Sequence, residues 1–194
     1  MHAWFKNTKV TNVNYTLYPN YESIIPKLVD LNTNNIKDMS SLFYGCSNIS
    51  GSTLFGTPDD FSSMQTDGLE YIDSMFEGSN IGSTNANSYT FNLKTNNVKY
   101  MSRVFADVGF DASTFTSYSI GNNFNTSNVV DMSGIFSGCS ANANTNLSLS
   151  SNFNTGKVTN FSHMFEHFNG IDKIIEKFYN MNTSSATDMS YMFN

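Results

Sequence analysis

A thirteen-residue phrase occurs six times in this chain of 194 residues. Each copy starts with an apolar residue, has Thr at its third position and an aliphatic residue at its sixth, and ends in Phe. The copies are LNTNNIKDMSSLF from Leu31, MQTDGLEYIDSMF from Met64, LKTNNVKYMSRVF from Leu93, FNTSNVVDMSGIF from Phe124, FNTGKVTNFSHMF from Phe153 and MNTSSATDMSYMF from Met181. A weaker seventh copy, FKNTKVTNVNYTL, starts at Phe5.

The spacing of the copies predicts the architecture. From Val10 to Ala186, the aliphatic residues at the sixth position are 26, 33, 29, 31, 29 and 28 residues apart. Periods of this length are typical of supersecondary units that stack and bury one continuous core. We therefore expect a single repeat-solenoid domain over 1–194. Residues 1–30 form a divergent first rung or cap, and 31–194 hold six repeats, the last of them incomplete.

The ends of such an array need polar caps. The last copy stops one residue after Phe193, so we expect an uncapped C-terminal edge through which the chain self-associates.

A Ser or Asp precedes the last apolar pair of every copy, where the N-cap of a short helical turn belongs. These residues are Ser40, Asp73, Ser102, Ser133, Ser162 and Ser190. The final residues then predict an aromatic column of Phe43, Phe76, Phe105, Phe136, Phe165 and Phe193. The third residues lie in turn-forming contexts and predict a ladder of hydroxyls from Thr33, Thr66, Thr95, Thr126, Thr155 and Thr183.

Segments between the copies alternate apolar and small polar residues, as half-buried strands do. SYTFNL at 88–93, SYSIGNNF at 117–124 and LSLSSNF at 147–153 therefore predict parallel strands. Their outward residues would be Ser88, Thr90, Ser119, Ser148 and Ser150. After the fifth copy, Ile171, Ile174, Ile175 and Phe178 recur at helical spacing, so we expect one rung to carry a helix in place of its strand.

The charge of the chain limits its partners. The net charge is −6, only 13% of residues are charged, and the ten Lys and Arg residues occur singly. Without a basic stripe that could neutralise a row of phosphates, we do not expect nucleic-acid binding. No segment approaches the roughly 20 apolar residues of a membrane span. Cys46 and Cys139 lie three rungs apart, too far for a disulfide, and are expected to be free thiols.

The phrase NTSNVVDMSGIFSGC at 125–139 resembles the repeats of the BspA-like leucine-rich-repeat surface proteins of bacteria. Those repeats read Trp, Thr, Asn-Val-Thr-Asp-Met-Ser, Met-Phe and often Gly-Cys, and here other apolar residues replace the Trp. The resemblance covers almost the whole chain. It implies an α/β repeat fold: a leucine-rich-repeat-like right-handed solenoid of about six to seven rungs, with short parallel strands and short helical turns.

The same resemblance implies attachment at an extracellular or cell-surface location, with no catalytic residues to carry over. The chain shows neither a secretion leader nor a lipid-anchor cysteine near its start, so a virion or appendage component is the alternative.

One segment carries a metal-binding motif. His163, Glu166 and His167 match HxxEH, in which two His one helical turn apart bind zinc. The spacing arises within a single repeat, and Glu176 is the only further ligand in view. We expect a solvated edge rather than a metal site, no cofactor, and no enzyme activity.

The eighth residue of each copy differs between copies and forms the candidate binding column. It reads Asp38, Tyr71, Tyr100, Asp131, Asn160 and Asp188. Exposed tyrosines would suit contact with a partner, whereas the acidic members would equally serve turn backbone groups. We expect a recognition or adhesion module that binds protein or glycan through one face. A structural block of a virion, appendage or surface layer is the alternative.

Overall fold

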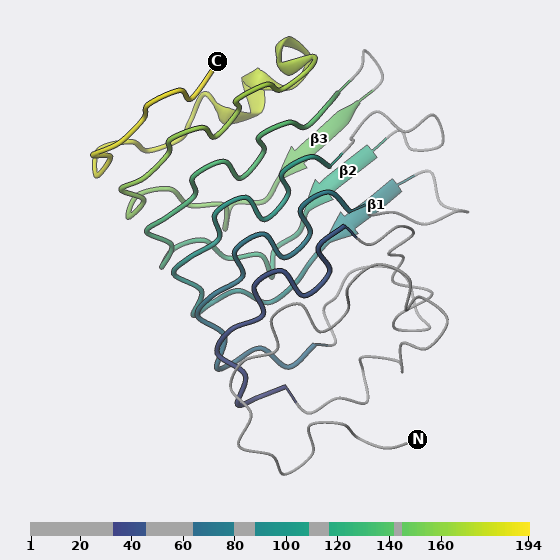
Figure 1. The fold of residues 1–194 in the computed structure, drawn as a ribbon, viewed down its shortest axis with the longest axis vertical. Helices are drawn as coiled ribbons and strands as arrows, with labels where there is room; N and C mark the ends of the chain where they lie inside the picture. Colours follow the sequence, from purple (N-terminus) through teal and green to yellow (C-terminus); the bar gives the residue numbers. More distant parts are fainter. Residues whose placement is uncertain (1–32, 46–63, 80–87, 109–116, 142–144) are drawn as a thin grey trace.

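The computed structural model describes residues 33–45, 64–79, 88–108, 117–141 and 145–194. Cys46 and the weak copy at Phe5 lie outside them. Within the described residues, the six copies lie one on another in chain order, from the purple copy to the yellow one (Figure 1). Parallel β-bridges join the eighth residue of each copy to the eighth residue of the next. The expected stacking of repeated units is therefore present in these six copies.

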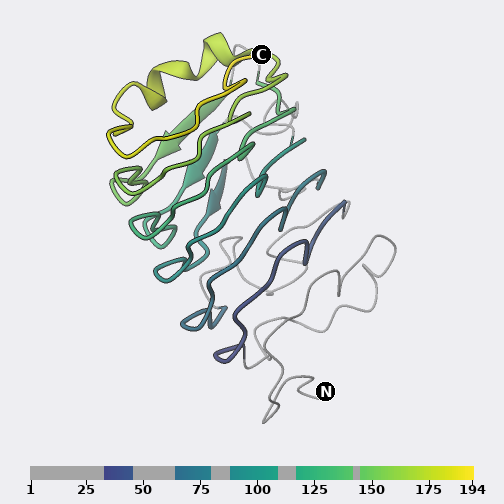
Figure 2. The same ribbon diagram turned by 60° about the vertical axis from the view of Figure 1, so that its left-hand side comes forward.

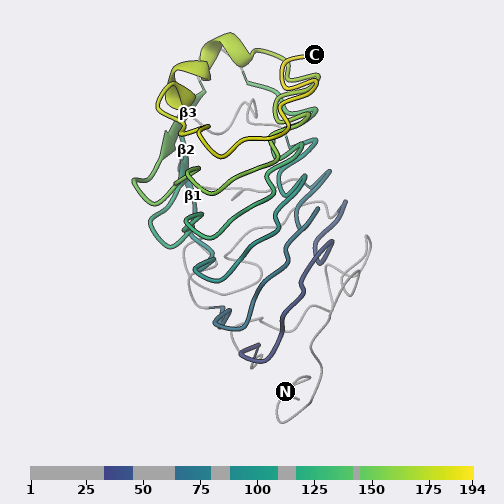
Figure 3. The ribbon, with the colours of Figure 1, turned by 90° about the vertical axis from the view of Figure 1, so that its left-hand side faces the viewer.

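Three short strands form a parallel sheet along one side of the array. They are β1 (Ser88–Phe91), β2 (Ser117–Ile120) and β3 (Asn146–Leu149), in the order β1-β2-β3. Phe91, Tyr118, Ile120 and Leu147 point into the core, whereas Thr90 and Ser148 are exposed. The alternation predicted from the sequence is confirmed for these side chains. Figure 3 shows the strands on one side and the turn segments on the other.

The second half of each copy is a run of β-turns, and alternate N–H groups in it bond the next copy. In the fourth copy and the two residues after it, four N–H groups donate to carbonyl oxygens of the fifth copy and the residue after it at 2.8–3.0 Å: Met132 to Asn160, Gly134 to Ser162, Phe136 to Met164 and Gly138 to Glu166. The N–H groups between them donate within the copy, as from Ile135 to the Met132 oxygen (3.2 Å). The same alternation occurs at all five junctions between the described copies.

The expected helical turn, with its N-cap at Ser40, Asp73, Ser102, Ser133, Ser162 and Ser190, is wrong. An α-helical turn directs its N–H groups along its own axis, so they would not point sideways to the neighbouring copy. In place of a helix, the chain forms turns with a positive φ at the residue after each predicted N-cap, as type II turns require. That φ lies between 53° and 58° at Ser41, Ser74, Arg103, Gly134, His163 and Tyr191.

The threonines at the third position also link successive copies. Thr95 Oγ1 donates to the Asn125 carbonyl (2.8 Å) and Thr126 Oγ1 to the Asn154 carbonyl (2.7 Å). Thr33 and Thr66 bond Gln65 and Lys94 in the same way. Each acceptor immediately precedes the next Thr in the row. The expected row of stacked threonine hydroxyls is therefore present at these four positions, and each hydroxyl bonds the backbone of the next copy.

The aromatic column is confirmed and forms the centre of the core. Neighbouring rings have centroids 5.2–6.2 Å apart and planes within 8–17° of each other, along Phe43, Phe76, Phe105, Phe136, Phe165 and Phe193. Phe91 packs its edge against Phe105 at 4.8 Å, so the sheet closes over the column. Aromatic pairs of this kind add about 0.5–1.5 kcal/mol to the burial of their area.

After the fifth copy, the rung that follows β3 is helical, as its spacing predicted. It consists of two 3-10 helices, η2 (Ile171–Lys173) and η3 (Ile175–Phe178), and η3 contacts β3. Ile174 and Phe178 are buried beneath them. Figure 2 shows this helical ribbon at the end of the array that holds the C-terminus. Gly170 has a φ of +79°, and a Cβ there would lie 2.1 Å from the Ala141 carbonyl oxygen.

Cys139 is a free, fully buried thiol, as expected, and its Sγ lies 2.9 Å from the Phe105 carbonyl oxygen that it bonds. Burial raises the pKa of the Cys139 thiol far above its usual range, so this sulfur serves packing rather than chemistry. Cys46 lies outside the described residues.

Replacing Phe136 by Ala tests the column. Phe136 is fully buried between Phe105 and Phe165, so Phe136→Ala should lower the free energy of unfolding by about 3–5 kcal/mol. Phe193 is 62% exposed, and Phe193→Ala should cost less than about 1 kcal/mol. Urea denaturation of both variants provides the comparison. Equal losses of unfolding free energy in the two variants would show that burial within the column does not determine how much each ring stabilises the fold.

Candidate functional site

The candidate column forms one continuous row across the array. Parallel bridges run from Asp38 to Tyr71, Tyr100, Asp131, Asn160 and Asp188 in that order. We call these six residues the Asp/Tyr row. Tyr71 and Asp188 are exposed and the other four are half-buried. The fold thus brings together, at one-rung spacing, residues that are up to 150 positions apart in the sequence (188 − 38).

Four members of the row support the turn that follows them. The side-chain Oδ1 of Asp38, Asp131, Asn160 and Asp188 accepts the N–H of the Ser two residues on, at 2.8–3.0 Å. This is the Asx-turn bond that such residues make within loops. The bond from Ser190 lowers the pKa of Asp188. These four side chains therefore have a structural role, which was one of the two interpretations of the sequence.

Tyr71 and Tyr100 differ, since their rings stack on each other at the surface. Their ring centroids lie 4.8 Å apart and their planes differ by 4°. Tyr71 is 38% exposed. A Tyr side chain cannot make the Asx-turn bond, and in its place the Asp73 Oδ1 accepts the Ser102 N–H from the neighbouring copy (2.7 Å). Burial raises the pKa of Asp73, and nearby Asp131 and Asp38 add to the increase.

The residues just before the row carry paired charges. Glu70 lies between Lys37 and Lys99, with its two carboxylate oxygens 3.4 and 2.8 Å from their Nζ atoms. The hydrogen bond and charge of Lys99 come first among the causes that lower the pKa of Glu70. These exposed pairs neutralise one another beside the tyrosines and contribute little to stability.

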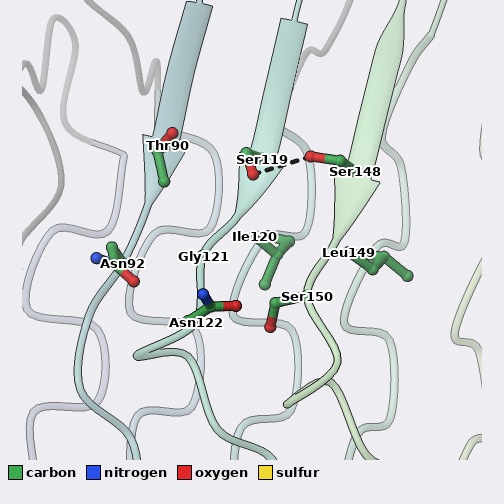
Figure 4. Close-up of a pocket in the computed structure, with 9 residues that line it drawn as sticks. All are labelled: Thr90, Asn92, Ser119, Ile120, Gly121, Asn122, Ser148, Leu149 and Ser150. Atoms are coloured by element: carbon green, nitrogen blue, oxygen red, sulfur yellow. Dashed lines mark hydrogen bonds between the residues drawn. The ribbon is translucent and has the colours of Figure 1, made fainter.

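A groove of about 340 Å³ crosses the ends of the three strands, and Figure 4 shows its lining. We call it the strand groove. Its nine lining residues are Thr90, Asn92, Ser119, Ile120, Gly121, Asn122, Ser148, Leu149 and Ser150. No residue in this lining is ionisable, and seven of the nine are hydroxyl, amide or glycine residues. Four of the five outward hydroxyls predicted from strand alternation, those of Thr90, Ser119, Ser148 and Ser150, therefore form one wall of this hollow, and the side chain of Ser88 lies outside the described part.

Hydrogen bonds hold the groove's polar groups in place. Ser148 Oγ donates to Ser119 Oγ across β2 and β3 at 2.9 Å (Figure 4). The Asn92 side-chain oxygen accepts the N–H of Asn123 at 2.8 Å. At Gly121 a Cβ would lie 2.5 Å from the Asn92 Oδ1, so the absence of a side chain there keeps the hollow open. These bonds fix the side chains of Ser119, Ser148 and Asn92 in place.

The HxxEH segment does not form the helical platform that zinc binding needs. His163 and His167 have φ values of +58° and +54°, because they occupy turn positions that bond the next copy. His163 Nδ1 lies 2.8 Å from Glu166 Oε2, and its ring stacks on Tyr191. Glu176 instead contacts Lys177. Among the residues that the structure describes, no three His, Cys, Asp or Glu side chains are grouped so that they could hold a metal ion.

The environment of Glu166 fits a structural role. Burial acts to raise the pKa of Glu166, but hydrogen bonds from His163 and Asn194 and the charge of His167 outweigh it, so the pKa is lowered. This carboxylate therefore links the fifth and sixth copies.

A family model matches the chain twice, over residues 2–118 and 75–194, and together the matches span nearly the whole sequence. That model describes a Mycoplasma protein of unknown function, DUF285. The chain belongs to the DUF285 family. Two overlapping matches to one model are what a repetitive chain produces, in agreement with the stacked copies. No curated protein and no solved structure matches this DUF285 chain.

One feature of the site was not predicted as a site from the sequence. The strand groove was not among the candidate site residues, although the alternation of SYTFNL and SYSIGNNF had placed its hydroxyls on one face. Its lower wall, Asn92 and Asn122, lies just past the ends of β1 and β2, within the segments 88–93 and 117–124 that were predicted to be strands. In the described part of the chain, the structure contains no helix long and apolar enough to cross a bilayer.

Proposed function

We propose that this DUF285 protein is a non-catalytic recognition module that mediates adhesion by binding a glycan through one face of its repeat array. The observation that carries the proposal is the strand groove. Its hydroxyls and amides are ordered and uncharged, and they repeat from strand to strand. A protein ligand for this face is the competing outcome of the test below.

The chemistry of the groove favours a neutral, polyhydroxylated ligand. Each Ser or Thr hydroxyl offers one donor and two acceptor sites, and each Asn amide offers both kinds, which matches the hydroxyls of a sugar. Adjacent strands lie about 4.8 Å apart, so equivalent hydroxyls of Thr90, Ser119 and Ser148 recur at that interval. A linear chain lying across the strands would meet the same groups repeatedly. An anionic ligand would find no counter-charge in this lining.

Each hydrogen bond to such a ligand contributes only about 0.5–1.5 kcal/mol. Useful affinity would therefore come from several rungs acting together, or from several molecules displayed on one surface. This requirement fits adhesion better than capture of a single small molecule.

Two finer features belong to the same proposal. We infer that the array is a right-handed leucine-rich-repeat-like solenoid of the BspA-like type, supported by the NTSNVVDMSGIF phrase and the parallel bridges along the stack. We also place the protein at an extracellular or cell-surface location, or alternatively in a virion or appendage, because a glycan-binding face would act there.

Removal of the groove hydroxyls tests the proposal. The triple variant Thr90→Val, Ser119→Ala, Ser148→Ala should keep its fold, because these side chains lie on the outer face of the sheet. On an array of neutral, sulfated and sialylated glycans, the unmodified protein should bind neutral glycans and the variant should bind them at least about tenfold more weakly, as expected from three lost bonds.

The matched control is Ser151→Ala with Ser184→Ala, which removes two exposed hydroxyls outside the groove lining and should leave glycan binding unchanged. Unchanged binding by the triple variant, or the absence of any neutral glycan ligand, would contradict the proposal. A ligand of purely protein character would do so as well.

A structural block of a virion, appendage or surface layer is the second candidate. The observation in its favour is the exposed face of the sixth copy, where Met189 and Phe193 are 45% and 62% exposed. Their equivalents in the fifth copy, Phe161 and Phe165, are buried. A copy-like edge of a second molecule could cover these side chains.

Light scattering across a hundredfold range of concentration tests this second role. Association that is abolished by Met189→Ser with Phe193→Ser would support a structural block, because the substitutions remove the apolar face. A monomer at every concentration would exclude self-association through this edge.

A further inference from the structure

We infer that the stacked pair Tyr71 and Tyr100, with Asp38 and Asp131 on either side of it, is a docking surface for a basic segment of a protein partner. This inference goes beyond the proposed glycan function, because it concerns a different surface and none of its residues line the strand groove.

The scaffold does not account for the two tyrosines. At four of six copies the eighth residue is Asp or Asn, and its Oδ1 accepts a turn N–H at 2.8–3.0 Å. Tyr71 and Tyr100 cannot make that bond, because their side chains have no carboxylate or amide oxygen. Local rules of this kind are most often broken where a residue serves function rather than folding. The row itself therefore singles out these two positions among its six.

The tyrosines are presented in a form suited to binding. Each ring covers one face of the other at 4.8 Å, which fixes both side chains before a partner arrives. Tyr supplies a large amphipathic contact area at low cost in side-chain entropy, and it is enriched in interface hot spots. Tyr71 remains 38% exposed on a surface that is otherwise mostly polar.

The charges around the pair select a cationic partner. The row places Asp38 one rung beyond Tyr71 and Asp131 one rung beyond Tyr100, on the two outer sides of the stacked pair. Asp38 Oδ1 and Asp131 Oδ1 each accept a turn N–H, and Asn160 Nδ2 donates to Asp131 Oδ2 at 3.4 Å, but a carboxylate can accept about four hydrogen bonds and keeps its charge. Asp73 adds a third acidic group close to both. The nearby Lys37 and Lys99 are held by Glu70.

At each end of this surface, an Arg side chain would contact both the tyrosine ring and the neighbouring carboxylate. Its planar guanidinium stacks on an aromatic face while its N–H groups reach a carboxylate, which Lys does less well. The surface therefore has two equivalent clamps, Asp38 with Tyr71 and Tyr100 with Asp131, three rungs apart at their outer ends. A partner segment with two Arg side chains in extended chain could occupy both. The net charge of −6 favours its approach.

The test replaces both tyrosines with the residue that the scaffold prefers. Tyr71→Asn with Tyr100→Asn leaves the net charge unchanged and introduces the side-chain acceptor that the other four row members use for the turn N–H two residues on, although the Ser102 N–H already bonds Asp73 Oδ1. The melting temperature should therefore stay the same or rise. The probe is a fluorescent ten-residue peptide of Arg alternating with Gly and Ser, measured by anisotropy at 0.05 and 0.15 M NaCl. The double variant should bind it about tenfold more weakly, since two ring contacts are lost.

Two controls separate the ring contacts from other effects. Tyr71→Phe with Tyr100→Phe keeps the rings and should bind the peptide within about twofold of the unmodified protein. The groove triple variant should bind the peptide normally, so that failure of the glycan proposal leaves this measurement interpretable.

Three outcomes would overturn the inference. Equal binding by the Asn double variant would show that general charge attraction is responsible. A lower melting temperature in that variant would show that the stack is structural. Loss of neutral-glycan binding without loss of peptide binding would assign the tyrosines to the glycan.

Discussion

The fold depends on backbone hydrogen bonds that pass from one copy to the next through a run of β-turns. At each junction four N–H groups, on every second residue, donate to carbonyl oxygens of the following copy, as from Phe136 to Met164 at 3.0 Å. Because the intervening N–H groups bond within the copy, the segment leaves its backbone donors satisfied while it stacks the Phe column behind it. The positive φ at residues such as Ser74 and Arg103 is the conformational cost of this arrangement.

Residue patterns in the sequence predicted much of this structure. The period, the Phe column, the outward strand hydroxyls and the helical rung at 171–178 were all predicted from residues that recur at a fixed spacing. The type of turn was not. Ser followed two or three residues later by an apolar pair fits a helix N-cap and a β-turn equally well. The choice depends on bonds to residues about 30 positions away, as from Gly134 to Ser162, which local spacing does not reveal.

The candidate sites, too, were predicted only as far as residue spacing reaches. The Asp/Tyr row was predicted as a column, but only the structure separates its members, since Asp38, Asp131, Asn160 and Asp188 bond turns and Tyr71 and Tyr100 do not. The strand groove depends on Asn92 and Gly121 beyond the strand ends. The HxxEH motif no longer indicates a zinc site, because His163 and His167 lie in turns. Repeated residues build the scaffold, and departures from the repeat mark the surfaces proposed to bind.

Amide hydrogen exchange measured by NMR tests the central claim most directly. The N–H groups of Met132, Gly134, Phe136 and Gly138 lie in turns, yet each bonds the next copy. They should be protected as strongly as the β2 amides of Tyr118 and Ile120, with free energies of opening close to that of global unfolding. Exchange of these four at rates near those of an unstructured peptide, while β2 stays protected, would show that the turns do not hold the copies together.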